Sequence, residues 1–466
     1  MQIQFLGAAQ EVTGSKHLIT TDKGIKILLD CGMNQGKGQE TDSMNRDLGF
    51  EPNEIDYLVL SHAHIDHSGL IPYIHNKGFD GTIICTPATR DLCSIMLADS
   101  GRIQEYDTYI NNKKRASHNL PPLLPIFTLE DAHASMQYFV SVPFHKEYFI
   151  TTDISVVFTD TGHILGSSAV NLTIKEGEKS TRICYTGDIG RYRKRILKEP
   201  EAFPQADYII TESTYGDRLH ENLEDAENKL LKVVIDTCTK KKGKLIIPSF
   251  SIGRTQEIVY AFDRLKSKGL LPDVNVYVDS PLSTDATNIM RMHPECFNNE
   301  ILEFMKTDAD PFGFKHLHYI QSVDQSKALN TNHKPCIIIS ASGMMEAGRV
   351  KHHLANNIEN PKTTILVVGY CAPTTLGARI SRGDKMVSIF GHHYAVKADI
   401  EHLESYSAHG DYEEMTRFLS CQNTKKVKTI FLVHGELKVQ ENYSNHLQKH
   451  GFKKIEIPKL GETFNL

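Results

Sequence analysis

The 466-residue sequence lacks several features that would place it in other classes of protein. It has no apolar run of membrane-spanning length, no evident targeting signal in residues 1–7, no internal repeat and no low-complexity segment. Its nine cysteines are scattered, odd in number and without a Cys-x-x-Cys pair. This pattern favours reduced cysteines in a cytoplasmic protein over a disulfide framework.

The chain also has no excess of basic residues. Its 52 Lys and Arg residues stand against 57 Asp and Glu residues, for a formal net charge of -5. This balance argues against non-specific coating of nucleic acid but is compatible with a local basic groove. The length predicts two or three soluble globular domains with their own cores.

What the sequence does contain is a concentration of metal-ligand side chains in one turn of chain. His62, His64, Asp66 and His67 lie within six positions, directly after the apolar residues 55–60, which predict a buried strand. Such a set suits two ions side by side better than one, and zinc is the usual occupant. The alternative is a histidine-rich surface loop.

Further candidate ligands repeat one pattern, an apolar strand followed by a polar residue that often has glycine beside it. Asp30 ends the strand predicted at 25–30, and His163, Asp188 and His434 follow strands predicted at 154–159, 181–186 and 429–433. Each alone is better explained as an ordinary turn residue. Together they predict a metal site, because an α/β enzyme places its chemistry at the carboxyl ends of its strands.

Strands and helices alternate in the second half of the chain. The sequence predicts strands at 244–248, 274–279, 336–340 and 364–369, and helices at 222–238 and 255–266. This alternation predicts a mostly parallel sheet. In the first half we expect a helix at 87–104 and a polar surface excursion at 107–125. The Ser340–Met345 stretch is expected to open a helix whose N–H groups bind a phosphate, or to be an ordinary serine cap.

Glu212 and His409 are candidates for acid–base chemistry. Phosphodiester hydrolysis requires a proton for the leaving oxygen, which histidine supplies, and a bonded carboxylate would fix the tautomer of the imidazole. The alternative is that both residues cap a helix or turn. Arg254, Arg379 and Arg382 could line a phosphate groove or be ordinary solvated side chains.

The order of these motifs resembles that of the metallo-β-lactamase superfamily. The matching residues are Asp30, the His62-x-His64-x-Asp66-His67 run, His163 and Asp188. Glu212, His409 and His434 are similar to motifs of its β-CASP branch, whose members cut nucleic acids. Supporting stretches lie at 248–254, 279–282, 342–345 and 369–370. The resemblance spans nearly the whole chain and is nearest to the mRNA 3′-end cleavage nucleases and their short bacterial and archaeal relatives.

The resemblance implies an α/β fold. Residues 1–211 and 392–466 would form an αββα metallo-β-lactamase sandwich, and residues 212–391 an inserted β-CASP domain of mostly parallel sheet. The cofactors would be two Zn²⁺ ions. The implied ligands are His62, His64 and His163 for one ion, Asp66, His67 and His434 for the other, and Asp188 bridging them. The implied catalytic residues are Asp66, Glu212 and His409, the implied phosphate-binding residues are Ser342, Gly343 and Met344, and Asp30 would orient a ligand histidine.

The implied function is a two-zinc ribonuclease that hydrolyses single-stranded RNA, as an endonuclease, a 5′ exonuclease or both. The alternatives are a non-catalytic scaffold subunit, a small-ester hydrolase and a DNA phosphodiesterase. The seven expected ligands are all present, which argues against the scaffold, and the domain-length insertion argues against the small-ester hydrolase. We expect no membrane partner; the assembly considered is a homodimer.

Overall fold

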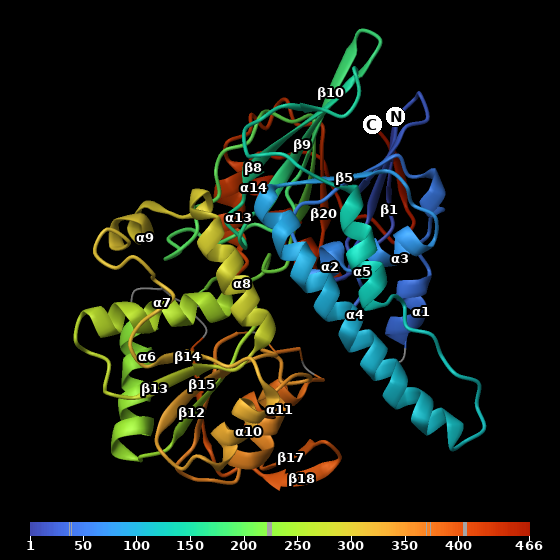
Figure 1. The fold of residues 1–466 in the computed structure, drawn as a ribbon. Helices are drawn as coiled ribbons and strands as arrows, with labels where there is room; N and C mark the ends of the chain where they lie inside the picture. Colours follow the sequence, from blue (N-terminus) through green and yellow to red (C-terminus); the bar gives the residue numbers. More distant parts are fainter. Residues whose placement is uncertain (37, 39, 221–225, 370, 373, 404–407) are drawn as a thin grey trace. The chain divides into compact units, whose positions relative to one another are not determined.

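The chain forms two compact units in the computed structural model (Figure 1), which describes residues 1–466 apart from 37, 39, 221–225, 370, 373 and 404–407. Unit 1 comprises Met1–Tyr192, Lys198–Leu219 and His409–Leu466, and unit 2 comprises Arg193–Leu197 and His220–Ala408. Residues 212–219 thus lie in unit 1 and residues 392–408 in unit 2, whereas the domains predicted from the sequence change after 211 and 391.

Unit 1 is built on two seven-stranded sheets. The first has the order β22 (Thr463–Asn465), β1 (Gln2–Phe5), β2 (His17–Thr20), β3 (Lys26–Leu29), β4 (Tyr57–Val59), β5 (Thr82–Cys85) and β6 (Phe139–Ser141). The second has the order β21 (Ile455–Glu456), β20 (Thr429–Val433), β11 (Tyr208–Glu212), β10 (Lys179–Tyr185), β9 (Ser168–Glu176), β8 (Ile154–Asp160) and β7 (Tyr148–Phe149). β3 and β4 run parallel, as do β10, β11 and β20, so their carboxyl ends share one edge within each sheet.

The two sheets of unit 1 bury one apolar core between them. Alternate strand residues point inward; Ile27 and Val59 of the first sheet and Val156 and Phe431 of the second belong to one buried cluster. Outside the second sheet, a further buried cluster joins its strands to α13 (Tyr412–Leu419) and α14 (Leu437–Lys449). The remaining helices of unit 1 are α1 (Glu40–Arg46), α2 (Ile65–Ser68), α3 (Ile71–Asn76), α4 (Pro87–Ala116) and α5 (Leu129–Ser135), with short turns at Pro52–Glu54 and Met136–Tyr138. Figure 1 shows α3, α4 and α5 beside the first sheet, which gives the predicted αββα layering.

Helix α4 is longer than the sequence predicts. It runs from Pro87 to Ala116, so the first half of the expected surface excursion at 107–125 is helical. Residues 107–116 contain no glycine or proline, and Lys113, Lys114 and Arg115 suit the carboxyl end of a helix dipole. The predicted end of the helix at 104 was therefore wrong, and the mostly exposed surface excursion begins as the last turns of α4.

Unit 2 is built on a six-stranded parallel sheet. Its order is β14 (Leu317–Tyr319), β13 (Asn275–Val278), β15 (Cys336–Ser340), β12 (Lys244–Pro248), β16 (Thr364–Val367) and β19 (Asp399–His402), with a separate hairpin of β17 (Met386–Ile389) and β18 (His392–Ala395). Its helices are α6 (Ala226–Val234), α7 (Arg254–Ser267), α8 (Pro281–Met292), α9 (Asn299–Phe304), α10 (Val323–Thr331), α11 (Val350–Asn357) and α12 (Leu376–Ser381). A π-helical segment at Ile235–Lys240 follows α6, and a short 3₁₀ turn lies at Pro294–Cys296. The predicted parallel sheet is confirmed.

The loop after β15 differs from its prediction. The Ser340–Met345 stretch does not open a helix, because α11 begins only at Val350 and a loop of turns precedes it. Of the helix predicted at 222–238, residues 222–225 lie outside the described residues, as does Tyr370 of the 369–370 motif.

None of the nine cysteines forms a disulfide, and no helix among the described residues is long and apolar enough for a membrane span.

Candidate metal centre

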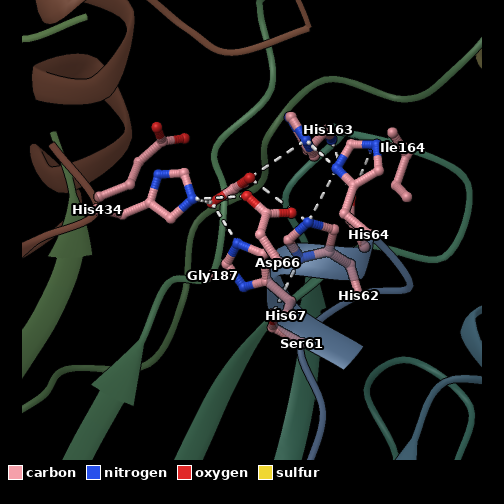
Figure 2. A network of polar contacts seen from close by, with 12 residues as sticks. Ser61, His62, His64, Asp66, His67, His163, Ile164, Gly187 and His434 are labelled. Carbon is pink, nitrogen blue, oxygen red and sulfur yellow. Dashed lines mark hydrogen bonds and ion pairs between the residues drawn. The ribbon is translucent and has the colours of Figure 1, made fainter. Parts of the chain in front are cut away.

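The predicted ligands of unit 1 meet at the carboxyl ends of its parallel strands. β4 leads into His62 and His64, and the short helix α2 carries Asp66 and His67. The loops after β8, β10 and β20 bring in His163, Asp188 and His434. Both sheets therefore contribute to one cluster, and Figure 2 shows the labelled side chains converging.

Four residues form the first group of this cluster: His62, His64, His163 and Asp188. The Nδ1 atom of His64 lies 3.2 Å from Nε2 of His62 and 3.2 Å from Nε2 of His163. The Oδ2 atom of Asp188 lies 3.4 Å from the same two Nε2 atoms. One carboxylate oxygen and three imidazole nitrogens thus surround a common point, as a tetrahedral zinc site requires.

Asp66, His67 and His434 form the second group. The Nε2 atom of His434 lies 3.3 Å from Oδ2 of Asp66. The other oxygen of Asp188, Oδ1, lies 3.3 Å from Nε2 of His67 and 3.8 Å from Nε2 of His434. Asp188 therefore presents one oxygen to each group, which is the arrangement a bridging carboxylate needs.

The electrostatics of the cluster suit cations. Burial lowers the pKa of His64 to about 3 and the pKa values of His62 and His163 below the usual value, so these rings keep a lone pair for a metal. Burial opposes charge on Asp66 and Asp188, yet the neighbouring histidines hold both pKa values below the ordinary range.

Two of the buried ligand atoms lack the hydrogen bonds that buried polar atoms normally form, as expected of atoms that bind a metal. Nε2 of His67 and Oδ1 of Asp188 are buried, and beyond their 3.3 Å contact with each other neither forms a hydrogen bond with any described residue. Such orphaned atoms are costly unless another partner binds them. Nitrogen and oxygen donors in this number match zinc, so the residues fit the metal that the resemblance implies.

Outer residues hold the ligands in place. Asp30 Oδ2 lies 2.6 Å from His67 Nδ1, and Tyr185 donates its hydroxyl to the same oxygen at 2.7 Å. Thr214 Oγ1 lies 2.9 Å from Nδ1 of His434. Contacts of this kind fix ring orientation in metal sites. The sequence predicted the role of Asp30 but not that of Tyr185 or Thr214, although Thr214 follows the candidate Glu212 by two residues.

His409 and Glu212 are brought together at the edge of the cluster. His409 Nδ1 lies 3.0 Å from Glu212 Oε2 and 3.8 Å from Asp188 Oδ2, and the Ile189 N–H donates to Glu212 Oε1. Burial disfavours charge on His409, but the carboxylates of Glu212 and Asp188 outweigh it and raise its pKa to about 9. The side chain of His409 is 21% exposed, whereas Glu212 is 1% exposed, so the histidine is the member of the pair that a substrate can reach.

The predicted phosphate-binding residues Ser342, Gly343 and Met344 lie in unit 2, in the loop after β15. Ser342 Oγ is engaged within this loop, since it accepts from the Ala347 N–H and donates to the Ala347 carbonyl, both at 3.3 Å. The three arginines are each paired: Arg254 with Glu257, and Arg379 and Arg382 with Asp384. Among the described residues, no acceptor is bonded to the N–H groups of Gly343 and Met344.

A buried histidine–carboxylate cluster at the strand ends of an αββα sandwich defines a metal-dependent hydrolase. Residues 14–248 match the metallo-beta-lactamase superfamily, residues 255–380 the Beta-Casp domain, and residues 393–458 the Zn-dependent metallo-hydrolase RNA specificity domain. The chain therefore belongs to the metallo-β-lactamase superfamily, in its β-CASP branch of nucleases.

Similar proteins come from bacteria, archaea and animals. The chain is 32% identical over 440 residues to "Ribonuclease TTHA0252" of Thermus thermophilus, which covers 94% of this chain and 93% of that protein. It is 29% identical over 468 residues to the transcription termination factor FttA of Methanosarcina mazei, covering 98% of this chain and 70% of that protein. It is 30% identical over 440 residues to the cleavage and polyadenylation specificity factor 73 of Drosophila melanogaster, covering 94% of this chain and 60% of that protein.

Proposed function

We propose that the protein is a two-zinc ribonuclease that hydrolyses phosphodiester bonds of single-stranded RNA. The observation that carries the proposal is the double engagement of Asp188, whose Oδ2 faces His62 and His163 while its Oδ1 faces His67. A site for one metal ion requires only one group of ligands, whereas here each oxygen of the Asp188 carboxylate faces a separate group. The ribonuclease named among the similar proteins supports RNA as the substrate.

The residues of the site hold the metal ions, orient a ligand or transfer a proton. Bound zinc would supply Lewis-acid activation of water and neutralise charge on the phosphate. The ligands His62, His64, His163, Asp66, His67, His434 and Asp188 hold the ions, and Asp30 orients His67. His409, held by Glu212 through Nδ1, presents its Nε2 proton to the leaving 3′ oxygen, which leaves the 5′ phosphate on the other product.

Two assays test the proposal. RNA labelled at its 5′ end and the same RNA labelled at its 3′ end, each incubated with the metal-loaded protein, distinguish internal cleavage from stepwise removal of 5′ nucleotides. RNA and DNA of one sequence, compared at matched salt, test substrate choice; we expect faster cleavage of RNA. Equal or faster cleavage of DNA would overturn the RNA assignment while leaving a two-metal phosphodiesterase.

Elemental analysis tests the metal count independently of activity. Protein purified without added metal should contain about two equivalents of zinc, because seven ligands are too many for one tetrahedral site. A value near one in fully active protein would contradict the bridging role of Asp188.

A further inference from the structure

Two loops of unit 2 lie side by side at the carboxyl edge of its parallel sheet. β12 and β15 are adjacent strands with Pro248 opposite Ser340, and Ser249 N–H continues the pairing by donating to the Ser340 carbonyl at 3.0 Å. The loop after β12 contains Phe250, and the loop after β15 contains Gly343 and Met344.

These loops also lie where the strand order of the sheet reverses. After β12 the chain forms α7 and then β13, which lies beyond β15 in the sheet. After β15 it forms α11 and then β16, which lies beyond β12. The two connections run in opposite directions across the sheet, so right-handed crossovers put α7 and α11 on opposite faces. Loops that leave adjacent strands toward opposite faces are where α/β sheets bind ligands.

The loop after β15 offers backbone donors to an anion. Among the described residues, no acceptor is bonded to the N–H groups of Gly343 and Met344, while the Met344 carbonyl is engaged by the Gly377 N–H at 3.1 Å. The Ser342 hydroxyl closes the loop on Ala347. Successive free N–H groups on a braced loop are a typical binding site for phosphate oxygens.

Phe250 lies directly against this loop. A Cβ atom built on Gly343 would lie 2.8 Å from Cδ2 and 2.9 Å from Cε2 of the Phe250 ring, so only glycine permits the approach. The Phe250 carbonyl accepts from the Thr255 N–H at 3.3 Å and from the Thr255 hydroxyl at 2.8 Å, which fixes the backbone that carries the ring. Phe250 nevertheless remains 42% exposed. An aromatic ring held in place beside phosphate donors and open to solvent is what a nucleobase stacks on.

We propose that Phe250 is a base-stacking platform of the substrate-binding surface of unit 2. One nucleotide of single-stranded RNA places its phosphate on the N–H groups of Gly343 and Met344 and its base on the exposed part of the Phe250 ring. Because every base has a π-face, this contact binds RNA without reading its sequence. The assignment of RNA as the ligand rests on the proposed function.

The test is a double-mutant cycle on the metal-loaded full-length protein. Its ligands are a short oligoribonucleotide with phosphorothioate linkages, which resist hydrolysis, and the same oligomer made abasic one position at a time. Phe250→Ala should weaken binding of the intact oligomer by roughly five- to a hundredfold. It should have little further effect on the oligomer whose stacked base has been removed. Phe250→Tyr should bind as the wild type does.

Controls separate stacking from folding. Phe149→Ala removes an exposed ring of unit 1 and should not change binding. Phe250→Leu keeps apolar bulk and removes the π-face, so it should bind as weakly as Phe250→Ala. If Phe250→Ala weakens binding of the intact and every abasic oligomer equally, or does not weaken it, the stacking role is wrong. Absence of RNA binding by the wild type would overturn it as well.

Failure of this inference is distinguishable from failure of the proposed function. Hydrolysis of bis(p-nitrophenyl) phosphate by the wild type reports on the metal centre without a nucleobase. Coupling in the cycle together with no hydrolysis of this ester or of RNA would reject the ribonuclease and keep the stacking site. Hydrolysis of both without coupling would reject the stacking site alone.

Discussion

Unit 1 and unit 2 both place polar groups at the carboxyl ends of parallel strands, but they use different parts of the chain. In unit 1 the donors are side chains, and Asp188 and His434 each follow a strand as a single chemically distinctive residue. In unit 2 the proposed phosphate donors are the backbone N–H groups of Gly343 and Met344. A metal requires particular ligand atoms, whereas a phosphate accepts any well-placed N–H. Residue types therefore predict the metal centre directly, whereas the proposed phosphate loop is predicted only from small residues after a strand and from the family resemblance.

Replacing the shared carboxylate should give the largest effect and tests the first half of this comparison. Asp188→Asn removes charge from both ligand groups at once. We expect loss of metal and a fall in activity on the order of ten-thousandfold or more, since activation of water depends on the ion. Zinc content and RNA cleavage are measured together, with the exposed His118→Ala as the control. Retention of two zinc equivalents would show that Asp188 is not a ligand.

Removing His409 should separate catalysis from metal binding. His409 lies outside both ligand groups, so His409→Ala should keep its zinc while activity falls by roughly a hundred- to ten-thousandfold. His64→Ala is the matched variant, and it should lose both metal and activity. Full turnover by His409→Ala would mean that another group protonates the leaving oxygen.

The sequence predicted the parts of this site that depend on local order. The His62–His67 run and the residues after β8, β10 and β20 were all found, because each follows an apolar strand that can be recognised by itself. The pairing of β1 with β22 was not predicted, since contacts between the two ends of a chain leave no local pattern. Tyr185 was missed for the same reason: its bond to Asp30 joins residues 155 positions apart. Phe250 could not be distinguished from other phenylalanines until its contact with Gly343 was known.

A change behind the ligands should have a smaller effect than a change of a ligand. Asp30→Asn keeps the shape of the side chain but removes the charge that holds His67 Nδ1–H and accepts from Tyr185. We expect metal affinity to fall by roughly ten- to a hundredfold. Competition with a chelator of known affinity measures this, and Asp22→Asn, a change at an exposed carboxylate, serves as the control. Unchanged zinc affinity would show that the orientation of His67 does not depend on Asp30.

The smallest expected effect concerns a buried carboxylate of unit 2 that lacks the cationic partners of Asp188. Asp263 in α7 is 1% exposed, and its Oδ2 forms no hydrogen bond with any described residue. Burial, with the charges of Asp308 and Asp310 added, raises its pKa to about 7. The folded protein then binds a proton that the unfolded chain releases near pH 4, so this group stabilises the fold at low pH. That contribution decreases as the pH rises from about 4 and is lost above the folded pKa of about 7.

Asp263→Asn removes this charge and should make unit 2 more stable than the wild type at neutral and higher pH. At pH 8 the difference in unfolding free energy should be about 2 kcal/mol, below the roughly 4 kcal/mol that three pKa units represent, because the new amide must also be buried. At pH 5 the difference should shrink or reverse, since wild-type Asp263 is then neutral. Thermal unfolding of both proteins between pH 5 and 8 measures this, with the exposed Asp285→Asn in α8 as the control. A difference that does not vary with pH would mean that Asp263 is ionised in the folded protein, and that unit 2, like unit 1, stabilises its buried carboxylate with a compensating partner.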